Sequence, residues 1–294
     1  MSKNRKVLFV LWLTLLLNIL VSSIKIIVGT LTGIGSILAD GYHSLADASS
    51  NIIGLITMKI AQKPVDADHS YGHQRYETLA TLFIVALLTY LGIEVIGKSI
   101  DSFQNPSFNR PDVITLLLMI FTFGVNLFVA LYENIAGKKF NSSLLIADSK
   151  HTLSDIYISS GVLINLLLIT YLNAPLWLDA VTSFLVALII FKTAYSIFKE
   201  SSHELTDAIA IDPKRIEEIV LKNPKVFSVH KIRSRKSGSH VFIDFHVKSD
   251  PGMPLVDAHN LSHDLEEQLR HVFGDELGVI VHVEPEGYNY KKKD

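Results

Sequence analysis

The sequence contains no cysteine among its 294 residues, which excludes disulfide bonds, thiolate metal sites and a cysteine nucleophile. Charge is also scarce, since Asp, Glu, Lys and Arg make up 19% of the chain and the formal net charge is −2. Nucleic-acid binding depends on an excess of positive charge that this chain lacks, so we expect no nucleic-acid partner. The groups that remain for metal or proton chemistry are carboxylates and 12 histidines.

These charges are distributed unevenly along the chain. Residues 1–200 contain 27 charged side chains, and the much shorter remainder contains 29. The first part holds six apolar stretches, each long enough to cross about 30 Å of hydrocarbon as a helix. They lie near 7–29, 36–61, 77–100, 112–135, 144–171 and 176–198. We predict a membrane domain of six transmembrane helices over residues 1–203 and a soluble domain over residues 204–294.

The loop lysines and arginines predict the orientation of these helices. They fall before the first span, between the second and third, between the fourth and fifth, and after the sixth. The loops on the opposite side offer only Arg110, with Lys98 nearby. The positive-inside rule therefore places both termini and the soluble domain in the cytoplasm. We expect an integral protein of the cell (plasma) membrane, surrounded by membrane lipid.

A short pattern with ionisable residues occurs twice, near the start of the second and of the fifth span. Residues 39–47 read ADGYHSLAD and residues 147–155 read ADSKHTLSD. Transporters are often built from internal repeats, with the substrate site at the repeat interface. Within each copy a histidine and an aspartate are four residues apart, so they share one face of a helix. The two pairs are His43 with Asp47 and His151 with Asp155.

Ionisable side chains inside a span indicate function, because burying them costs several kcal/mol unless they are paired or hydrated. Brought together, the two pairs offer two nitrogen and two oxygen ligands, which suits tetrahedral Zn²⁺. The same ligands could hold Cd²⁺, Co²⁺ or Fe²⁺, whereas Mn²⁺ and Ca²⁺ favour more oxygen. The alternative is that two His–Asp hydrogen bonds only hold helices together. Asp40 and Asp148 lie almost a turn earlier, and we interpret them as a supporting shell or vestibule, or as helix N-terminal charges.

The soluble segment is predicted to fold in the order α-β-β-α-β, as a C-terminal α/β domain. Alternation of apolar and polar residues over 241–247 indicates a strand, and Ser237-Gly238 indicates the hairpin turn before it. Pro213 and Pro254 each open a helix. The expected elements are a helix at 213–223, strands at 226–236 and 241–247, a helix at 254–273 and a strand at 279–283.

The two H-x-x-x-D motifs, six spans with cytoplasmic ends and a histidine-rich soluble tail together resemble the cation diffusion facilitators. That family comprises proton-coupled exporters of divalent metals. The resemblance covers residues from about 7 to 286. Residues 66–77, DADHSYGHQRYE, are similar to the family signature D-x-x-H-x-x-G-H-x-[KR]-x-E.

The resemblance implies a homodimeric secondary transporter that exports Zn²⁺ in exchange for protons and is not an enzyme. The transport site would be His43, Asp47, His151 and Asp155. Some family members have Asp or Asn at the place of His43, and the histidine form is associated with zinc, whereas oxygen-richer variants are associated with manganese. The tail would have the metallochaperone-like (ferredoxin-like) fold of the family's cytoplasmic domain.

Three further features are implied by the same resemblance. A second metal site would lie in the cytoplasmic loop, formed by Asp66, His69 and His73. An ion pair between Arg75 and Asp207 would act as a hinge between the membrane domain and the tail. A pair of regulatory metal ions near the dimer interface would be bound by His230, His246, His259, His282 and Glu284.

Other functions remain as alternatives. A manganese or iron(II) exporter would use the same scaffold. An intramembrane metalloenzyme would need a general base, but no H-E-x-x-H motif occurs and no spare glutamate lies beside either His–Asp pair. The position of the site inside the spans disfavours a pure metal sensor. An ATP-driven pump is disfavoured because no G-x-x-x-x-G-K-[ST] motif occurs.

Overall fold

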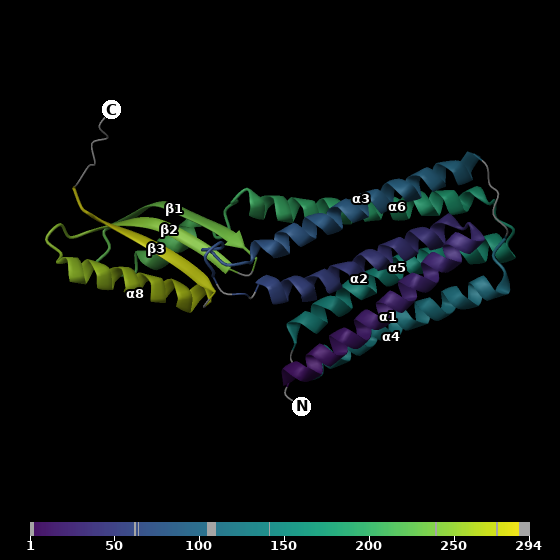
Figure 1. Ribbon diagram of the computed structural model, residues 1–294, viewed down its shortest axis with the longest axis horizontal. Coiled ribbons are helices and arrows are strands. Elements are labelled where there is room, and N and C mark those ends of the chain that lie inside the picture. The colour runs from purple at the N-terminus through teal and green to yellow at the C-terminus, as the bar shows by residue number, and fades with distance from the viewer. Residues whose placement is uncertain are drawn as a thin grey trace. The chain divides into compact units, whose positions relative to one another are not determined.

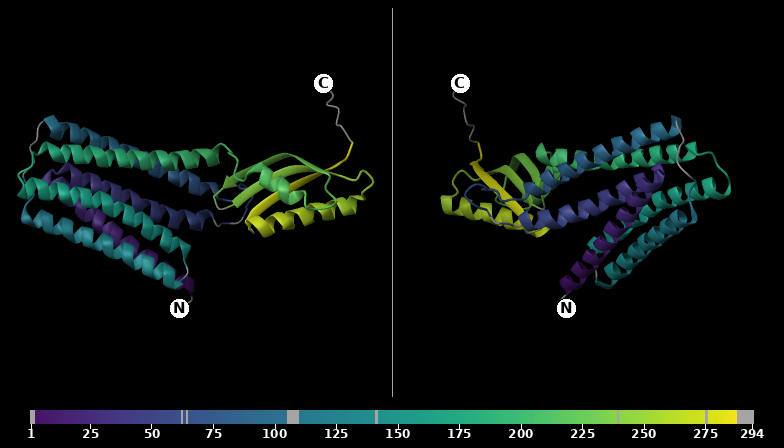
Figure 2. Two further views of the ribbon diagram at one scale, coloured as in Figure 1. Left: turned by 180° about the vertical axis from the view of Figure 1, so that it is seen from behind. Right: turned by 45° about the vertical axis from the view of Figure 1, so that its right-hand side comes forward.

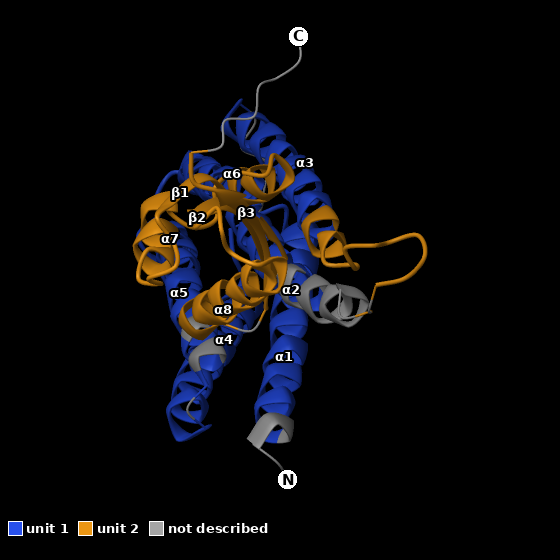
Figure 3. Cartoon of the chain, turned by 90° about the vertical axis from the view of Figure 1, so that its left-hand side faces the viewer, with its two compact units in different colours: residues 1–56, 80–198 blue, residues 57–79, 199–294 orange. Residues whose placement is uncertain are grey.

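The computed structural model describes residues 3–61, 63, 65–104, 110–140, 142–238, 240–274 and 276–287. The chain separates into two compact units (Figure 3). Unit 1 consists of Met1–Ile56 and Ala80–Phe198, and unit 2 consists of Thr57–Leu79 and Lys199–Asp294. Unit 2 thus combines the tail with the loop that precedes the third predicted span. The domain boundary predicted after residue 203 stays a prediction.

Unit 1 is built from long helices that lie side by side (Figure 1). They are α1 (Lys3–Thr32), α2 (Gly35–Ala61), α3 (Arg75–Gln104), α4 (Val113–Phe140), α5 (Ser143–Tyr171) and α6 (Trp177–Leu205). Each coincides with one of the predicted spans and extends past it by a few residues at one or both ends. The helical fold class is therefore confirmed, and α4 packs against both α1 and α5.

Five of these helices are long and apolar enough to cross a membrane, judged on the residues that the structure describes: α1, α3, α4, α5 and α6. Helix α2, which coincides with the second predicted span, is not among them. Its 27 residues would extend for about 40 Å, but it carries Asp40, His43 and Asp47 within its first half. Its role as a sixth transmembrane helix stays a prediction, and these polar residues make α2 the natural place for a site.

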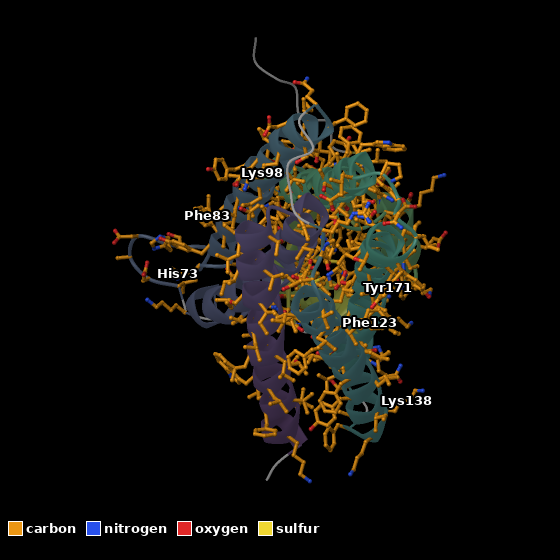
Figure 4. The ribbon with its side chains drawn as sticks, turned by 90° about the vertical axis from the view of Figure 1, so that its right-hand side faces the viewer. His73, Phe83, Lys98, Phe123, Lys138 and Tyr171 are labelled. Atoms are coloured by element: carbon orange, nitrogen blue, oxygen red, sulfur yellow. The ribbon has the colours of Figure 1, made fainter. Side chains whose placement is uncertain are left out.

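Apolar side chains occupy both the interior and the outer surface of unit 1. Ile37 of α2, Leu88 of α3 and Leu166 of α5 are among the fully buried residues of its core. Phe83 of α3 is 66% exposed and lies at the edge of the helices (Figure 4), and Tyr90 is 65% exposed. Such an apolar exterior suits contact with hydrocarbon rather than with water.

The tail in unit 2 has the predicted α-β-β-α-β order. Its elements are α7 (Pro213–Val220), β1 (Ser228–Ser237), β2 (His240–Ser249), α8 (Leu255–Phe273) and β3 (Leu277–Pro285). The sheet order is β1-β2-β3, with β1 antiparallel and β3 parallel to β2. Helix α7 ends at Val220, three residues earlier than predicted, because the chain turns at Leu221.

Helices α7 and α8 cover one face of this sheet, and in both views of Figure 2 α8 runs along it. The core between them is made by alternate residues of β2, such as Ile243 and Phe245, packed with Leu261 and Leu265 of α8. Because side chains alternate along a strand, His246 of β2 points to the opposite face. The face away from α8 thus carries His246.

Candidate metal centre

Two helices of unit 1 bring together the four residues of the repeated motif. His43 Nε2 of α2 lies 3.4 Å from Asp155 Oδ1 of α5 and 3.7 Å from Asp47 Oδ2. His151 Nε2 of α5 lies 3.3 Å from Asp47 Oδ1. Potential ligand atoms of His43, Asp47 and Asp155 all lie within 4.8 Å of one another, and His151 stands next to this group.

The arrangement follows from the spacing within each motif and from the direction in which the helices cross. The contacts, in order along α2, are Asp40 with Ser159 (3.0 Å), His43 with Asp155 (3.4 Å) and Asp47 with His151 (3.3 Å). The partners on α5 run backwards along the chain, so the two helices are antiparallel here. Since histidine and aspartate are four residues apart in both copies, an antiparallel crossing sets each histidine against the aspartate of the other copy.

The side chains of the site differ in how far they are exposed. The side chain of His43 is 4% exposed and that of Asp155 is 15% exposed, whereas that of His151 is 54% exposed. The buried atoms His43 Nε2 and Asp47 Oδ2 have no hydrogen-bond partner. Native proteins rarely leave buried polar atoms unpaired, and a cation between these two atoms would satisfy both. The donor set therefore suits a divalent metal, with His151 the most exposed of the four ligands.

Sequence reasoning missed three buried ionisable residues of unit 1. Lys25 of α1 is 0% exposed and its Nζ lies 2.8 Å from Asp40 Oδ2, one of the two aspartates that we predicted to support the site. Glu133 of α4 is 0% exposed and accepts a hydrogen bond from Thr152 at 3.4 Å. Each lies inside a predicted apolar span, and this was the signal that could have found them.

The third missed residue is Asp179 of α6, which caps the N-terminus of α2. It accepts hydrogen bonds from the backbone N–H groups of Gly35 (2.8 Å) and Ser36 (3.2 Å), and from the Ser36 hydroxyl. The Asn165 amide also donates to it at 3.4 Å. A carboxylate at this end satisfies unpaired N–H groups and the helix dipole, and it holds the start of α2 against α5 and α6.

The loop in unit 2 brings together the three residues of the predicted second metal site. His69 Nδ1 lies 3.0 Å from Asp66 Oδ1, and His73 Nε2 lies 3.2 Å from Asp66 Oδ2. The two imidazole rings are 4.2 Å apart between centroids. One carboxylate oxygen and two imidazole nitrogens are groups that bind Zn²⁺ in proteins. The aspartate side chain is 51% exposed, so this group lies close to solvent.

In the tail, the strand register places three histidines side by side across the sheet. His246 of β2 is paired with His230 of β1 and with His282 of β3. Glu284 stands beside them: its carboxylate lies 2.7 Å from His246 Nδ1, 3.2 Å from His230 Nε2 and 3.7 Å from His282 Nε2. The hydrogen bond from His246 holds the pKa of Glu284 below its usual range.

The fifth residue of the predicted tail site lies elsewhere. His259 is exposed on α8, where its ring lies 4.6 Å from that of His263, and it is not in the group of His230, His246 and Glu284. The reason is topological, because α8 covers one face of the sheet and His246 points from the other. Within a single chain, the structure does not join His259 to the row of strand histidines.

The predicted ion pair between Arg75 and Asp207 is present within unit 2. Arg75 donates to Asp207 Oδ1 at 2.9 Å, and Arg235 Nη1 lies 3.5 Å from the same oxygen. Both partners of the pair are about half exposed. An exposed pair of this kind contributes only about 0–1 kcal/mol of stability, so a hinge function, which stays a prediction, would not depend on its strength.

Two domain families match this chain in sequence. The family described as "Cation efflux transmembrane domain" matches residues 11–206, and "Cation efflux protein, cytoplasmic domain" matches residues 210–286. The Manganese efflux system protein MneS of Bacillus subtilis is 31% identical over 91% of each chain. The Uncharacterized transporter YdbO of the same organism is 32% identical over 91% of this chain and 92% of its own. The Cation-efflux pump FieF of Shewanella oneidensis is 29% identical over 90% of this chain and 88% of its own.

Proposed function

The chain belongs to the cation diffusion facilitators, the family of the two cation efflux domains that it matches, and from this premise we propose that it exports Zn²⁺ from the cytoplasm in exchange for protons. Efflux of divalent metal cations by an integral membrane protein follows from the family itself. The relatives are transporters, in agreement with a function other than catalysis. The choice of zinc and the exchange for protons are the parts that we propose.

The observation that carries the proposal is the ligand set in unit 1. His43 and His151 supply two imidazole nitrogens, and Asp47 and Asp155 supply two carboxylates, from two helices that cross at the site. Two nitrogens and two oxygens suit a tetrahedral Zn²⁺ site. The unpaired buried atoms His43 Nε2 and Asp47 Oδ2 support a site that is completed by its cargo.

The same ligands provide a reason for exchange with protons. A metal ion binds neutral imidazole and ionised carboxylate, so protons and metal compete for the same lone pairs. A site that faces the cytoplasm without protons binds Zn²⁺, and a site that faces the other compartment releases it when the ligands are protonated. His43 and His151 are the proposed carriers of the protons, because unperturbed imidazole titrates near physiological pH.

Manganese is the second candidate cargo, and the name of a relative favours it. The Manganese efflux system protein MneS is 31% identical to this chain over 91% of its length. Against manganese stands the chemistry of the site, because Mn²⁺ favours oxygen ligands and His43 supplies a nitrogen. A direct comparison of the two metals therefore decides between the candidates.

We further propose that the working transporter is a homodimer in the plasma membrane, with both termini in the cytoplasm. The match to the cytoplasmic domain of cation efflux proteins supports dimerisation through the tail. Metal bound by the row of strand histidines and Glu284 would tighten the two tails and favour one facing state of the membrane domain. A ligand shifts such an equilibrium only by its differential affinity for the two states.

The test uses the purified protein in sealed vesicles, with Zn²⁺ or Mn²⁺ added outside and a metal-sensitive dye and a pH dye inside. We expect Zn²⁺ to accumulate faster than Mn²⁺, and the lumen to become more alkaline as Zn²⁺ enters. The paired variant Asp47→Asn with Asp155→Asn should not accumulate metal, whereas Asp101→Asn, an exposed acid on α3, should behave like the parent. Accumulation of Mn²⁺ without Zn²⁺ would refute zinc as cargo, and uptake without any pH change would refute proton exchange.

A further inference from the structure

A lysine is buried in unit 1 one helical turn from the proposed transport site. Lys25 of α1 is 0% exposed, and its Nζ lies 2.8 Å from Oδ2 of Asp40, which is 1% exposed. The ammonium also donates to Ser44 Oγ at 3.1 Å and to Ser159 Oγ at 2.9 Å. The ammonium thus has one ion-pair partner and two hydrogen-bond acceptors. Ser159 in turn donates to Asp40 Oδ1 at 3.0 Å, so one oxygen of the carboxylate accepts a hydrogen bond and the other faces the ammonium.

The lysine reaches its partner because α1 and α2 approach closely at two places near it. A Cβ atom on Gly41 of α2 would lie 2.9 Å from the backbone nitrogen of Ile26 and 3.1 Å from Cβ of Lys25. A Cβ atom on Gly29 of α1 would lie 2.6 Å from the backbone nitrogen of Leu38. Only glycine leaves room for this contact, so the position of the ammonium is set by backbone packing as well as by charge.

Asp40 and Ser159, the two partners of Lys25 that bond to each other, lie beside the transport site on both of the helices that form it. On α2, Asp40 precedes His43 by three residues, and on α5, Ser159 follows Asp155 by four residues. Residues three and four apart on a helix share a face. Asp40 thus adds a carboxylate to the two of the site, Asp47 and Asp155. It lies on the same face of α2 as His43, one turn from where the metal would bind.

A third carboxylate this close to a divalent cation would change the preference of the site. Carboxylate oxygens favour Mn²⁺ over Zn²⁺ when they outnumber nitrogens, because hard oxygen ligands suit Mn²⁺. We propose that Lys25 is a specificity-determining residue, which holds Asp40 out of the ligand set and so keeps the site at two imidazoles and two carboxylates. This inference rests on the transport site proposed above.

The test compares substitutions that break the same ion pair from opposite sides, in the vesicle assay, with the ratio of Mn²⁺ to Zn²⁺ uptake as the readout. Lys25→Met removes the ammonium at similar length and frees the carboxylate, so the ratio should rise by about tenfold, as expected when the partner of a group beside a metal is lost. Asp40→Asn breaks the same pair but leaves the ammonium, so uptake of both metals should fall without a rise in the ratio. The double variant Lys25→Met with Asp40→Asn should return the ratio to that of the parent.

A purely structural role predicts a different pattern. If the pair only holds α1 against α2, Lys25→Met and Asp40→Asn should slow the uptake of both metals alike and leave the ratio where it was. That result, or a raised ratio that persists in the double variant, would overturn the proposal. If Lys25→Met does not reach the membrane in folded form, Lys25→Gln replaces it, because it removes the charge that faces Asp40 but keeps a polar end that can donate to Ser44 or Ser159. Its ratio should rise as well, and an unchanged ratio would overturn the proposal equally.

Metal uptake by the unsubstituted protein tests the proposed transport function separately from the function of Lys25. A parent that accumulates neither metal refutes the proposed transport, whatever the variants do. A parent that prefers Mn²⁺ refutes zinc as cargo, and the comparison of Lys25→Met with Asp40→Asn still decides the function of Lys25.

Discussion

Replacing Glu284 by glutamine should weaken zinc binding to the tail without unfolding it. Glu284 is the carboxylate grouped with His230 and His246 among the residues that the structure describes, and it lies 2.7 Å from His246 Nδ1 and 3.2 Å from His230 Nε2. Glutamine has the same shape but no charge, so the group of His230, His246 and Glu284 would lose its negative charge. The loss should be at least as large as that for an outer partner of a metal ligand, which is about 10–100-fold in affinity.

The size of the effect follows from the linkage between binding and folding. At a free Zn²⁺ concentration of 100 times the Kd, the parent tail should gain about 2.7 kcal/mol of unfolding free energy, whereas a variant that binds 100-fold more weakly gains about 0.4 kcal/mol. For a domain of this size, 1 kcal/mol shifts the Tm by about 4–8 °C. Zinc should therefore raise the Tm of the parent by about 10–20 °C and that of Glu284→Gln by about 2–3 °C.

The assay is thermal unfolding of residues 205–287 with and without Zn²⁺, supported by calorimetry. This segment contains its own buried core, including Ile216, Phe245 and Leu265, so it should fold alone. His263→Gln on α8 is the matched control, because His263 lies near Glu266 and outside the row, and its zinc shift should equal that of the parent. A parent tail with no zinc shift, or a Glu284→Gln tail with the full shift, would refute the regulatory site.

Without metal, the same carboxylate should make the stability of the tail depend on pH. The hydrogen bond from His246 lowers the pKa of Glu284 in the folded state below its ordinary value of 4.5. The folded state therefore binds fewer protons than the unfolded state, and this contribution to stability is complete above 4.5 and is lost as the pH falls through the folded pKa. Glu284→Gln should show a weaker loss of Tm below this pH in metal-free buffer, and an unchanged acid profile would contradict the assignment.

Three further outcomes are expected. Asp47→Ala or Asp155→Ala should abolish Zn²⁺ uptake in vesicles while the protein remains folded, because three remaining ligands bind Zn²⁺ much more weakly; uptake at the parent rate would show that the site is assigned wrongly. His43→Asp should admit Cd²⁺ and Mn²⁺ more readily relative to Zn²⁺, since oxygen replaces nitrogen, and competition uptake with an unchanged ratio would contradict this. Arg75→Ala should lower the free energy of unfolding by no more than about 1 kcal/mol, because its pair with Asp207 is exposed. It should still alter the transport rate if the pair acts as a hinge, and an unaltered rate would exclude that function.

Much of this protein could be predicted from local patterns in the sequence. Apolar stretches located α1 to α6, and alternation and turn residues located the strands of the tail, because these patterns depend on near neighbours along the chain. The i, i+4 spacing also identified His43 with Asp47 and His151 with Asp155, since such pairs share a helix face in any fold. The loop group of Asp66, His69 and His73 was instead predicted from the resemblance of residues 66–77 to the family signature.

The tertiary structure decided what these residues meet. The contacts of Ser159 with Lys25 and Asp40 join residues more than one hundred positions apart, and so does the cap that Asp179 provides for α2. The row of strand histidines depends on the register of three strands, and His259 was separated from it by the choice of the sheet face that α8 covers. A sequence shows that an ionisable residue inside an apolar span needs a partner, because leaving it unpaired is costly, but only the packing of the helices selects which partner it finds.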